Sequence, residues 1–392
     1  MNKYRAALRK KQIELVLMYP FVLLGKIAGY FFRLKTRHRH FLFFPSADIG
    51  GSVKVNAEIT ECIVKEKPLI IFSKKPGNNK FLPMFQQEGV RIIDLHRYID
   101  YKWYHFVNFF FRGVLATWIN RAEQPVVFGG ESLFFYKIIP HVKKGTRRIE
   151  LCHLNTWFPF SLGFIDDMDR RIFSTPKIKR DVERQYAENH LPQKYYDRLL
   201  FIDNKIDIPP LQPMNTAPPL QVLFVGRGAP QKRVHLIAAI AKAMHQAEEA
   251  VHFSFVGDVD AILPPEVKEY CTLYGQITDA AVLHNVYRQA DVLILTSAYE
   301  GLPLVVMDMM ARGKVVLSTN VDGIPDYITD KENGLLITGT TEADIVEQGV
   351  QLLTWLIRHP EERERIGTNA YTYTKAHFSK EVFDAAYKKL LL

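Results

Sequence analysis

Cysteine is scarce in this chain of 392 residues: Cys62, Cys152 and Cys271 lie far apart, and no two of them form a CxxC pair. This spacing argues against a zinc site and against a disulfide framework, and it fits a reducing, cytoplasmic setting. Long apolar runs are lacking as well. The longest uncharged run near the start, residues 15–25, is interrupted by Pro20 and is shorter than the roughly 20 residues that span a bilayer.

Excess positive charge is absent from most of the chain, although the formal net charge is +9. Residues 1–40 contain ten Lys and Arg and a single acid, Glu14, so the remainder balances 41 basic residues (51 − 10) against 41 acidic ones (42 − 1). A nucleic-acid-binding protein would carry basic residues along a face of its folded domains. The charge distribution therefore indicates a basic leader and no nucleic-acid partner.

The leader combines apolar residues with flanking clusters of Lys and Arg, and no small-residue cleavage site follows it. Such a segment suits the interface of an anionic membrane. The alternative is an ordinary leading helix that packs on the first domain. We expect residues 1–40 to place a cytoplasmic protein peripherally on the inner face of the membrane.

From residue 41 onward, short apolar strands alternate with loops and helical segments. Strands are predicted at 41–45, 68–73, 90–95, 125–130, 147–153, 170–175 and 198–203, and again at 221–226, 251–257, 272–277, 291–297, 315–319 and 334–337. Five prolines in residues 209–219 predict a linker between two domains. The pattern predicts an α/β protein with two doubly wound, Rossmann-like domains, 41–208 and 220–374, and a final helix near 375–392 that could return to the first domain.

A basic loop, VGRGAPQKR, opens the second domain. Gly226 permits a tight turn after the strand, and Arg227 and Lys232 flank the entry into a helix. Two cations beside a helix N-terminus suit a diphosphate, because the free N–H groups and the cations all favour negative charge. A solvated basic loop is the alternative.

Two acids stand eight residues apart in SAYEGLPLVVMDMMARG. Glu300 is predicted in the turn 298–301, Pro303 as the first residue of a helix, and Asp308 inside that helix. The unbonded N–H groups near Leu304 and Val305 would face the same ligand. An acid within this apolar run needs a partner: ribose hydroxyls, or local backbone if Asp308 is only structural.

These segments, with VDGIPDYITDKENGLLI and IDNKIDIPP, resemble the retaining glycosyltransferases of family 4, whose hallmark is a Glu-x7-Glu pair. The resemblance covers most of residues 198–340 and is thinner before them. It implies the GT-B fold, with the two domains facing an interdomain cleft, and a metal-independent, hexosyltransferase-type enzyme. The donor would be a nucleotide-diphosphate sugar, and no cofactor is implied. The acceptor would be a glycan or a lipid-linked molecule, and cell-surface polysaccharide assembly the pathway.

The resemblance also implies roles for residues. Arg227 and Lys232 would bind the donor diphosphate, Glu300 the sugar, and Asp308 the ribose. The remaining implied set comprises His153 as a hydrogen-bond partner of the sugar, the loop glycines Gly50 and Gly51, and Gly226 and Gly301 at the donor. The catalytic set is Glu300, His153, Arg227 and Lys232.

The chain departs from the family pattern at three positions: Asp308 replaces the second Glu, Asp322 replaces the first glycine of a Gly-Gly pair, and Lys205 replaces a turn glycine. Two Asp-x-Asp pairs, 258–260 and 167–169, could hold a metal in another transferase fold, but we assign no metal site. The aromatic stretch 98–120 predicts either core packing or an acceptor-side surface that touches membrane. The rival functions are a non-catalytic sugar-nucleotide-binding scaffold subunit and a sugar-nucleotide epimerase or hydrolase of the same fold.

Overall fold

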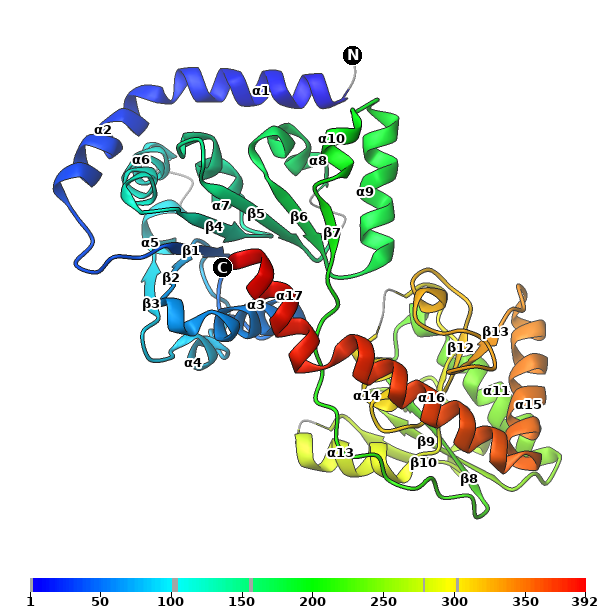
Figure 1. Ribbon diagram of the computed structural model, residues 1–392. Coiled ribbons are helices and arrows are strands. Elements are labelled where there is room, and N and C mark those ends of the chain that lie inside the picture. Colours follow the sequence, from blue (N-terminus) through cyan, green and yellow to red (C-terminus); the bar gives the residue numbers. More distant parts are fainter. Residues whose placement is uncertain (1–2, 101–104, 155–157, 278, 301–302) are drawn as a thin grey trace. The chain divides into compact units, whose positions relative to one another are not determined.

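The computed structural model describes residues 3–100, 105–154, 158–277, 279–300 and 303–392. The chain divides into two compact units (Figure 1). Unit 1 contains residues 1–204 and 384–392, and unit 2 contains residues 205–383. Each unit is built around its own parallel sheet, which confirms the α/β class with two Rossmann-like domains.

Unit 1 is built on a sheet of seven parallel strands in the order β3-β2-β1-β4-β5-β6-β7. A strand lies at each predicted position: β1 His40–Phe44, β2 Leu69–Phe72, β3 Arg91–Asp94, β4 Val126–Gly129, β5 Arg147–Cys152, β6 Arg170–Phe173 and β7 Leu199–Phe201. The strand order reverses between β1 and β4, and such a reversal is where ligands bind in open α/β sheets.

Helices cover both faces of this sheet (Figure 1). Their bounds are α3 Gly51–Cys62, α4 Leu82–Phe85, α5 His96–Ile99, α6 His105–Arg121, α7 Leu133–Ile138, α8 Phe158–Ser161, α9 Pro176–Glu188 and α10 Gln193–Tyr196. The core contains one fully buried ion pair, between Arg171 on β6 and Glu150 on β5. Tyr136, Tyr186 and Ser161 complete the hydrogen bonds of this pair, as a buried charge requires.

The leader forms two helices, α1 (Lys3–Leu17) and α2 (Tyr19–Phe31), bent by 60° at a break beside Pro20. Polar contacts attach α1 to the rest of unit 1. Tyr4 donates to Asp166 at 2.8 Å, Lys11 pairs with Asp167 at 2.8 Å, and Glu14 pairs with Arg112 and Lys137. The one acid of the leader is therefore neutralised by unit 1 itself.

Glycines attach α2 to α6. A Cβ at Gly25 would lie 1.9 Å from the carbonyl oxygen of Phe110, and one at Gly113 would lie 2.0 Å from that of Val22. The two backbones therefore cross in direct contact, and only glycine fits at the crossing. The aromatic stretch contributes to this interface, since the Phe21 ring lies 6.4 Å from that of Phe109. Residues 101–104 of that stretch lie outside the described residues.

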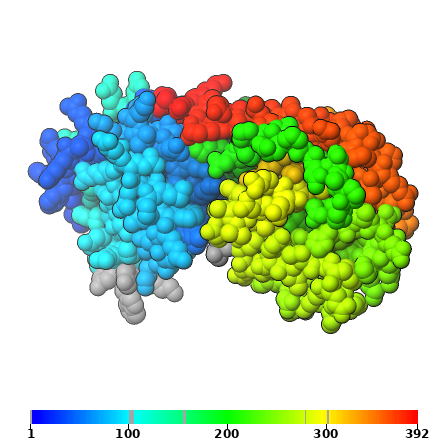
Figure 2. All heavy atoms as spheres, turned by 90° about the horizontal axis from the view of Figure 1, so that it is seen from below, coloured from blue at the N-terminus to red at the C-terminus, as the bar shows by residue number. Residues whose placement is uncertain are grey.

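Many large apolar side chains of the leader remain exposed. Residues at least 40% exposed are Ile13, Val16, Leu17, Tyr19, Phe21, Leu23, Leu24, Ile27, Tyr30, Phe31 and Phe32. We call these residues the apolar ridge. In the space-filling view the dark-blue leader lies at the surface (Figure 2). Within the described residues no single helix is long and apolar enough to span a membrane, whereas the bent pair α1–α2 meets that length and composition together.

Unit 2 contains a second parallel sheet, in the order β10-β9-β8-β11-β12-β13. Its strands again lie at the predicted positions, with β8 beginning one residue earlier than expected: β8 Leu220–Val225, β9 Val251–Val256, β10 Thr272–Gly275, β11 Val292–Leu295, β12 Val315–Thr319 and β13 Leu335–Ile337. The helices are α11 Val234–Gln246, α12 Pro265–Lys268, α13 Ala280–Gln289, α14 Leu304–Met310, α15 Glu342–Arg358 and α16 Pro360–Phe378. The order reverses between β8 and β11.

The proline-rich segment 209–219 has no helix or strand, and it packs on unit 2. Met214 lies against the hydrophobic core of that unit, and Tyr371 on α16 donates to the carbonyl of Pro209. Helix α17 (Lys380–Leu391) begins in unit 2 and ends in unit 1. The Tyr387 ring is buried there, 6.4 Å from that of Phe128 on β4.

Candidate functional site

The basic loop of unit 2 follows β8 at the reversal of strand order. Its glycines are required by close packing: a Cβ at Gly228 would lie 2.4 Å from the carbonyl oxygen of Asp258, and one at Gly226 would lie 2.9 Å from the Phe224 ring. Asp258 also accepts a hydrogen bond from the Gly228 N–H at 3.2 Å. The loop is thus held against the turn after β9 through Gly228, whereas Gly226 packs against the Phe224 ring of β8.

Lys232 forms an ion pair with Glu300, and Ser297 donates to the same carboxylate oxygen at 2.6 Å. The side chains of Lys232 and Glu300 are 14% and 7% exposed, so water screens the pair only partly. Lys232 ends a short 3-10 turn (Pro230–Lys232) after β8, and Glu300 follows β11. The two central strands of unit 2 therefore bring together two of the predicted catalytic residues.

A further residue, which the sequence did not single out, fixes this pair. Arg233 donates to the carbonyl oxygens of Thr296 and Ser297 at 2.7 and 2.8 Å, and its own φ is +47°. These bonds tie the loop after β8 to the end of β11. The sequence shows Arg233 as the third cation of the loop, after Arg227 and Lys232. Its role could not be inferred there, because it depends on β8 and β11 being neighbours in the sheet.

The backbone of Glu300 is held by the turn after β12. Asp322 accepts a hydrogen bond from the Glu300 N–H at 3.1 Å, and the Gly323 N–H donates to the Glu300 carbonyl at 3.1 Å. The φ of Asp322 is +45°, in the left-handed region where glycine is favoured and Asp is tolerated. The substitution of glycine by Asp322 therefore keeps the turn and adds a hydrogen bond to Glu300. No positive φ occurs at Lys205, so the turn there does not need a glycine.

Arg227 is exposed on the same loop, and it has no hydrogen-bond or ion-pair partner among the described residues. The two predicted diphosphate ligands thus differ, because Lys232 is neutralised by Glu300 whereas the charge of Arg227 faces solvent. An anion at this loop would meet one available cation and one that it must share with a carboxylate.

Asp308 lies in α14, which begins at Leu304 with Pro303 as its N-cap, one residue later than the sequence predicted. Its side chain is 24% exposed rather than buried, and it accepts from Arg312 at 3.3 Å within the same helical turn. The predicted partner requirement is thus met by an arginine. Leu304 is exposed, Val305 is half-buried, and the N–H groups of both precede the first intrahelical bond. Gly301 lies outside the described residues.

In unit 1 the loop after β1 carries Gly50 and Gly51. A Cβ at either glycine would meet nothing within 4 Å, so the protein's own packing does not require them. Asp48 anchors the loop, because it accepts from the N–H groups of residues 77–79 at 2.8–3.0 Å. Although burial opposes the shift, these bonds hold the pKa of Asp48 well below its usual range.

His153 follows β5 and has an imidazole Nε2 that is buried without a hydrogen-bond partner among the described residues. Burial lowers the pKa of His153 to about 4, so the ring is neutral at pH 7. A buried nitrogen of this kind is available to a ligand hydroxyl.

Glu131, which the sequence reasoning missed, lies beside this histidine. It follows β4, its φ is +55°, and it accepts from the His153 N–H at 3.2 Å. Burial raises the pKa of Glu131 to about 7, with the charge of Glu150 adding to the shift and hydrogen bonds from His153 and Ser52 opposing it. A carboxyl group that titrates near neutrality and is hydrogen-bonded to Ser52, the residue after Gly51, can exchange a proton with a bound hydroxyl.

The two Asp-x-Asp pairs take part in protein contacts. Asp260 pairs with Lys268 at 3.0 Å, Asp167 pairs with Lys11, and Asp169 accepts two bonds from Arg148 at 3.1 and 3.0 Å. Among the described residues, no group of three or more His, Cys, Asp or Glu side chains could hold a metal ion.

This architecture is that of GT-B glycosyltransferases. Anabaena Alr3699/HepE in complex with UDP superposes with a TM-score of 0.65 at 14% identity, over 90% of this chain and 99% of that one. WaaB, a lipopolysaccharide outer core galactosyltransferase, superposes with a TM-score of 0.64 at 16% identity, over 89% and 98% of the two chains. At these identities the likeness establishes the fold.

The match to a family model lies in unit 2. Residues 219–354 match the model of the family "Glycosyl transferases group 1". Trehalose synthase of Pyrococcus horikoshii is 25% identical in an alignment of 260 residues that covers 58% of this chain. The chain spans 59% of the length of that relative. The match and the fold together support a GT-B glycosyltransferase.

Proposed function

We propose that the protein is a retaining, metal-independent glycosyltransferase of family 4, which moves a hexose from a nucleotide-diphosphate sugar to a glycan or lipid-linked acceptor. The observation that carries the proposal is the Lys232–Glu300 pair at the strand reversal of unit 2. Arg227 lies on the same loop and has no partner among the residues that the structure describes. This is the position at which open α/β sheets bind nucleotides.

The chemistry requires charge neutralisation. When the anomeric C–O bond breaks, the leaving diphosphate takes the electron pair. The oxygen of the acceptor hydroxyl forms the new bond on the same face of the sugar, and its proton passes to the released diphosphate. Arg227 and Lys232 neutralise the leaving group in the place of a divalent cation. Glu300 contacts the sugar, and its ion pair with Lys232 holds the carboxylate beside the cation that meets the leaving diphosphate.

Unit 1 supplies groups suited to hydroxyls. The Nε2 of His153, which has no partner among the described residues, can accept a hydrogen bond from a sugar hydroxyl. Gly50 and Gly51 leave room for the backbone to approach a ligand. WaaB acts on the lipopolysaccharide outer core by its name, and the present chain shares its fold. This likeness supports cell-surface polysaccharide assembly as the pathway.

A peripheral location on the inner, cytoplasmic face of the membrane agrees with the leader. The apolar ridge faces outward, and ten Lys and Arg accompany it within residues 1–40. An anionic bilayer surface would cover the ridge and attract the cations.

A donor screen and two substitutions test the proposal. Thermal shifts with UDP-, GDP- and ADP-sugars identify the donor, and transfer to a lipid-linked glycan is then measured with the wild type and with Arg227→Ala and Lys232→Ala. Each variant loses a charge-assisted contact of about 1.5–3 kcal/mol, so kcat/KM should fall about ten- to 150-fold. Lys242→Ala is the matched control, because Lys242 pairs with Glu266 on the surface of the same unit.

Unchanged kcat/KM in both variants would contradict the assigned site. Conversion of the donor without an acceptor would indicate an epimerase or hydrolase, and donor binding without transfer would indicate a scaffold subunit. Inversion of the anomeric configuration in the product, read by NMR, would contradict the retaining mechanism.

A further inference from the structure

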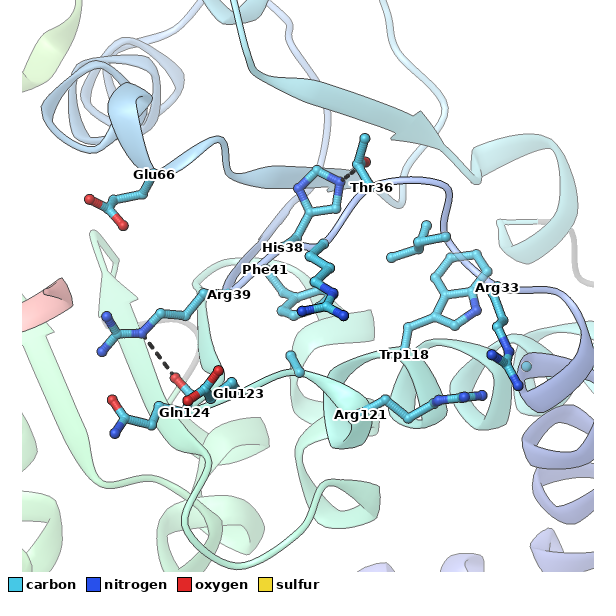
Figure 3. A pocket seen from close by; sticks show the side chains of 14 residues that line it. Arg33, Thr36, His38, Arg39, Phe41, Glu66, Trp118, Arg121, Glu123 and Gln124 are labelled. Carbon is cyan, nitrogen blue, oxygen red and sulfur yellow. Dashed lines mark hydrogen bonds between the residues drawn. The ribbon is translucent and has the colours of Figure 1, made fainter.

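A pocket of about 830 Å³ lies at the amino ends of the central strands of unit 1 (Figure 3). The loop that enters β1 forms one wall with Arg33, Arg37 and Arg39, and the end of α6 forms another with Trp118 and Arg121. The glycine loop after β1 lies at the opposite end of that strand. The pocket is therefore separate from the residues assigned to sugar transfer.

Four arginines line this pocket, and none of them forms an ion pair with a described residue. Two carboxylates, Glu66 and Glu123, also line it, but both lie away from the end where Arg33 and Arg121 flank Trp118 (Figure 3). That end of the pocket is cationic and has an aromatic floor. Arg39 donates to the carbonyls of Gln124 and Leu392, whereas Arg33 and Arg121 lie beside Trp118 without a carboxylate partner among the described residues. Guanidinium groups without a carboxylate partner suit the oxygens of a phosphate.

The protein holds the walls in place. His38 contacts the Lys67 carbonyl and the Thr36 hydroxyl, both at 2.7 Å, and this pins the loop before β1. Arg121 donates to the carbonyl of Tyr30 at 3.1 Å, and Trp118 donates to that of Phe32 at 2.7 Å. The end of α2 is thus fastened to the pocket rim.

The rim is apolar and exposed. Phe31 and Phe32 are 73% and 72% exposed, and they end the apolar ridge that begins at Ile13. A ligand with a phosphate in the pocket and an acyl chain along the ridge would satisfy both surfaces. We propose that this pocket binds the phosphate headgroup of an anionic membrane lipid, an inference that rests on the peripheral membrane location proposed above.

Charge favours a lipid surface over a second copy of the chain. Residues 1–40 carry ten cations, and their single acid is already paired with Arg112 and Lys137. A symmetric dimer through this face would oppose two such basic segments, whereas an anionic bilayer is complementary to them.

Vesicle co-sedimentation of the full chain tests the pocket, without donor or acceptor. The vesicles are phosphatidylcholine alone or phosphatidylcholine with phosphatidylglycerol. The variant Arg33→Gln/Arg37→Gln removes two exposed pocket arginines, and Arg5→Gln/Arg9→Gln removes the same charge from exposed positions of α1 outside it. If the attraction is only diffuse, each arginine removed weakens partitioning onto the anionic vesicles about fivefold, and the two double variants lose the same amount. A specific phosphate site makes the pocket variant at least about tenfold weaker than the control.

The outcomes are distinct. Equal losses in the two double variants overturn the pocket and leave only diffuse attraction. A wild type that binds neither kind of vesicle overturns both the pocket and the proposed membrane location. The proposed sugar transfer is tested separately, with a soluble acceptor, and does not depend on this result. Inorganic phosphate at constant ionic strength should weaken vesicle binding of the wild type more than that of the pocket variant, because it competes for the same arginines. An equal effect on the two proteins would overturn the pocket.

Discussion

Replacing Glu300 with glutamine should tighten the binding of a nucleoside diphosphate while it destabilises unit 2. In the free protein Glu300 neutralises Lys232, and the side chains are 7% and 14% exposed. Removing one partner of a buried pair costs about 3–5 kcal/mol. Because this pair is not fully buried and Gln keeps a hydrogen bond from Ser297, we expect a loss of about 2 kcal/mol, or about 4–8 °C in Tm for a unit of this size.

The gain in binding follows from the same charge. A carboxylate about 6 Å from one negative charge costs about 3 kcal/mol at an effective dielectric constant of about 20. Solvent at the exposed loop screens part of this repulsion. We therefore expect Glu300→Gln to bind UDP more tightly by about 1–2 kcal/mol, or about five- to thirtyfold. Sugar transfer should nevertheless fall, because the contact with the sugar is altered.

Calorimetric titration with UDP and denaturant unfolding measure the two effects. UDP without a sugar isolates the diphosphate from any contact between Glu300 and the hexose. Glu266→Gln is the matched control, since Glu266 pairs with Lys242 on the surface, and it should change neither quantity. Weaker UDP binding in Glu300→Gln, or unchanged stability, would refute the view that Glu300 neutralises Lys232 in the free protein and competes with the diphosphate for it.

Three other substitutions probe unit 1. Gly51→Ala should leave the free energy of unfolding within about 0.5 kcal/mol of the wild type, because a Cβ there meets nothing, but lower kcat/KM where a ligand approaches the loop. Gly25→Leu should destabilise the protein by about 1–3 kcal/mol and expose the leader to proteolysis, since its Cβ would lie 1.9 Å from a carbonyl oxygen of α6. Glu131 has a raised pKa, so its contribution to stability is full below pH 4.5 and is lost as the pH rises through about 7; Glu131→Gln should remove about 3 kcal/mol of this dependence in unfolding titrations.

Each of these three predictions would be contradicted by a specific result. A large loss of stability in Gly51→Ala would mean that the glycine serves the fold rather than a ligand. Normal protease resistance in Gly25→Leu would mean that α2 docks without close contact. A pH dependence of stability that is identical in Glu131→Gln and the wild type would mean that another group titrates there.

The strands of both units could be predicted from the sequence, because buried parallel strands are short, continuous apolar runs such as VLIL at Val292–Leu295. The donor-side loop was also predictable, since glycine and lysine followed a strand directly. What could not be predicted was which strand ends meet. Glu131 and His153 are 22 residues apart, and only the pairing of β4 with β5 brings them into contact.

The direction of the leader's side chains was likewise hidden. Composition indicated that the leader is apolar and basic. It did not indicate that the face of α2 with Gly25 packs against α6 while Phe31 remains exposed. Asp322 looked like a departure from the family pattern, and its positive φ and its bond to Glu300 became apparent only in three dimensions. Function-bearing contacts in this protein are therefore long-range, whereas its secondary structure is local.

Helix α17 imposes an order on the synthesis of the protein. Residues 384–392 complete unit 1, where Tyr387 covers Phe128 and the carbonyl of Leu391 accepts from His40 and Arg147. These contacts join positions 244 to 351 residues apart in the chain. Unit 1 emerges from the ribosome first, yet it remains open beside β4 until all of unit 2 has been made. The nascent protein must therefore keep an aromatic surface soluble throughout that interval, and chaperone binding would be concentrated there.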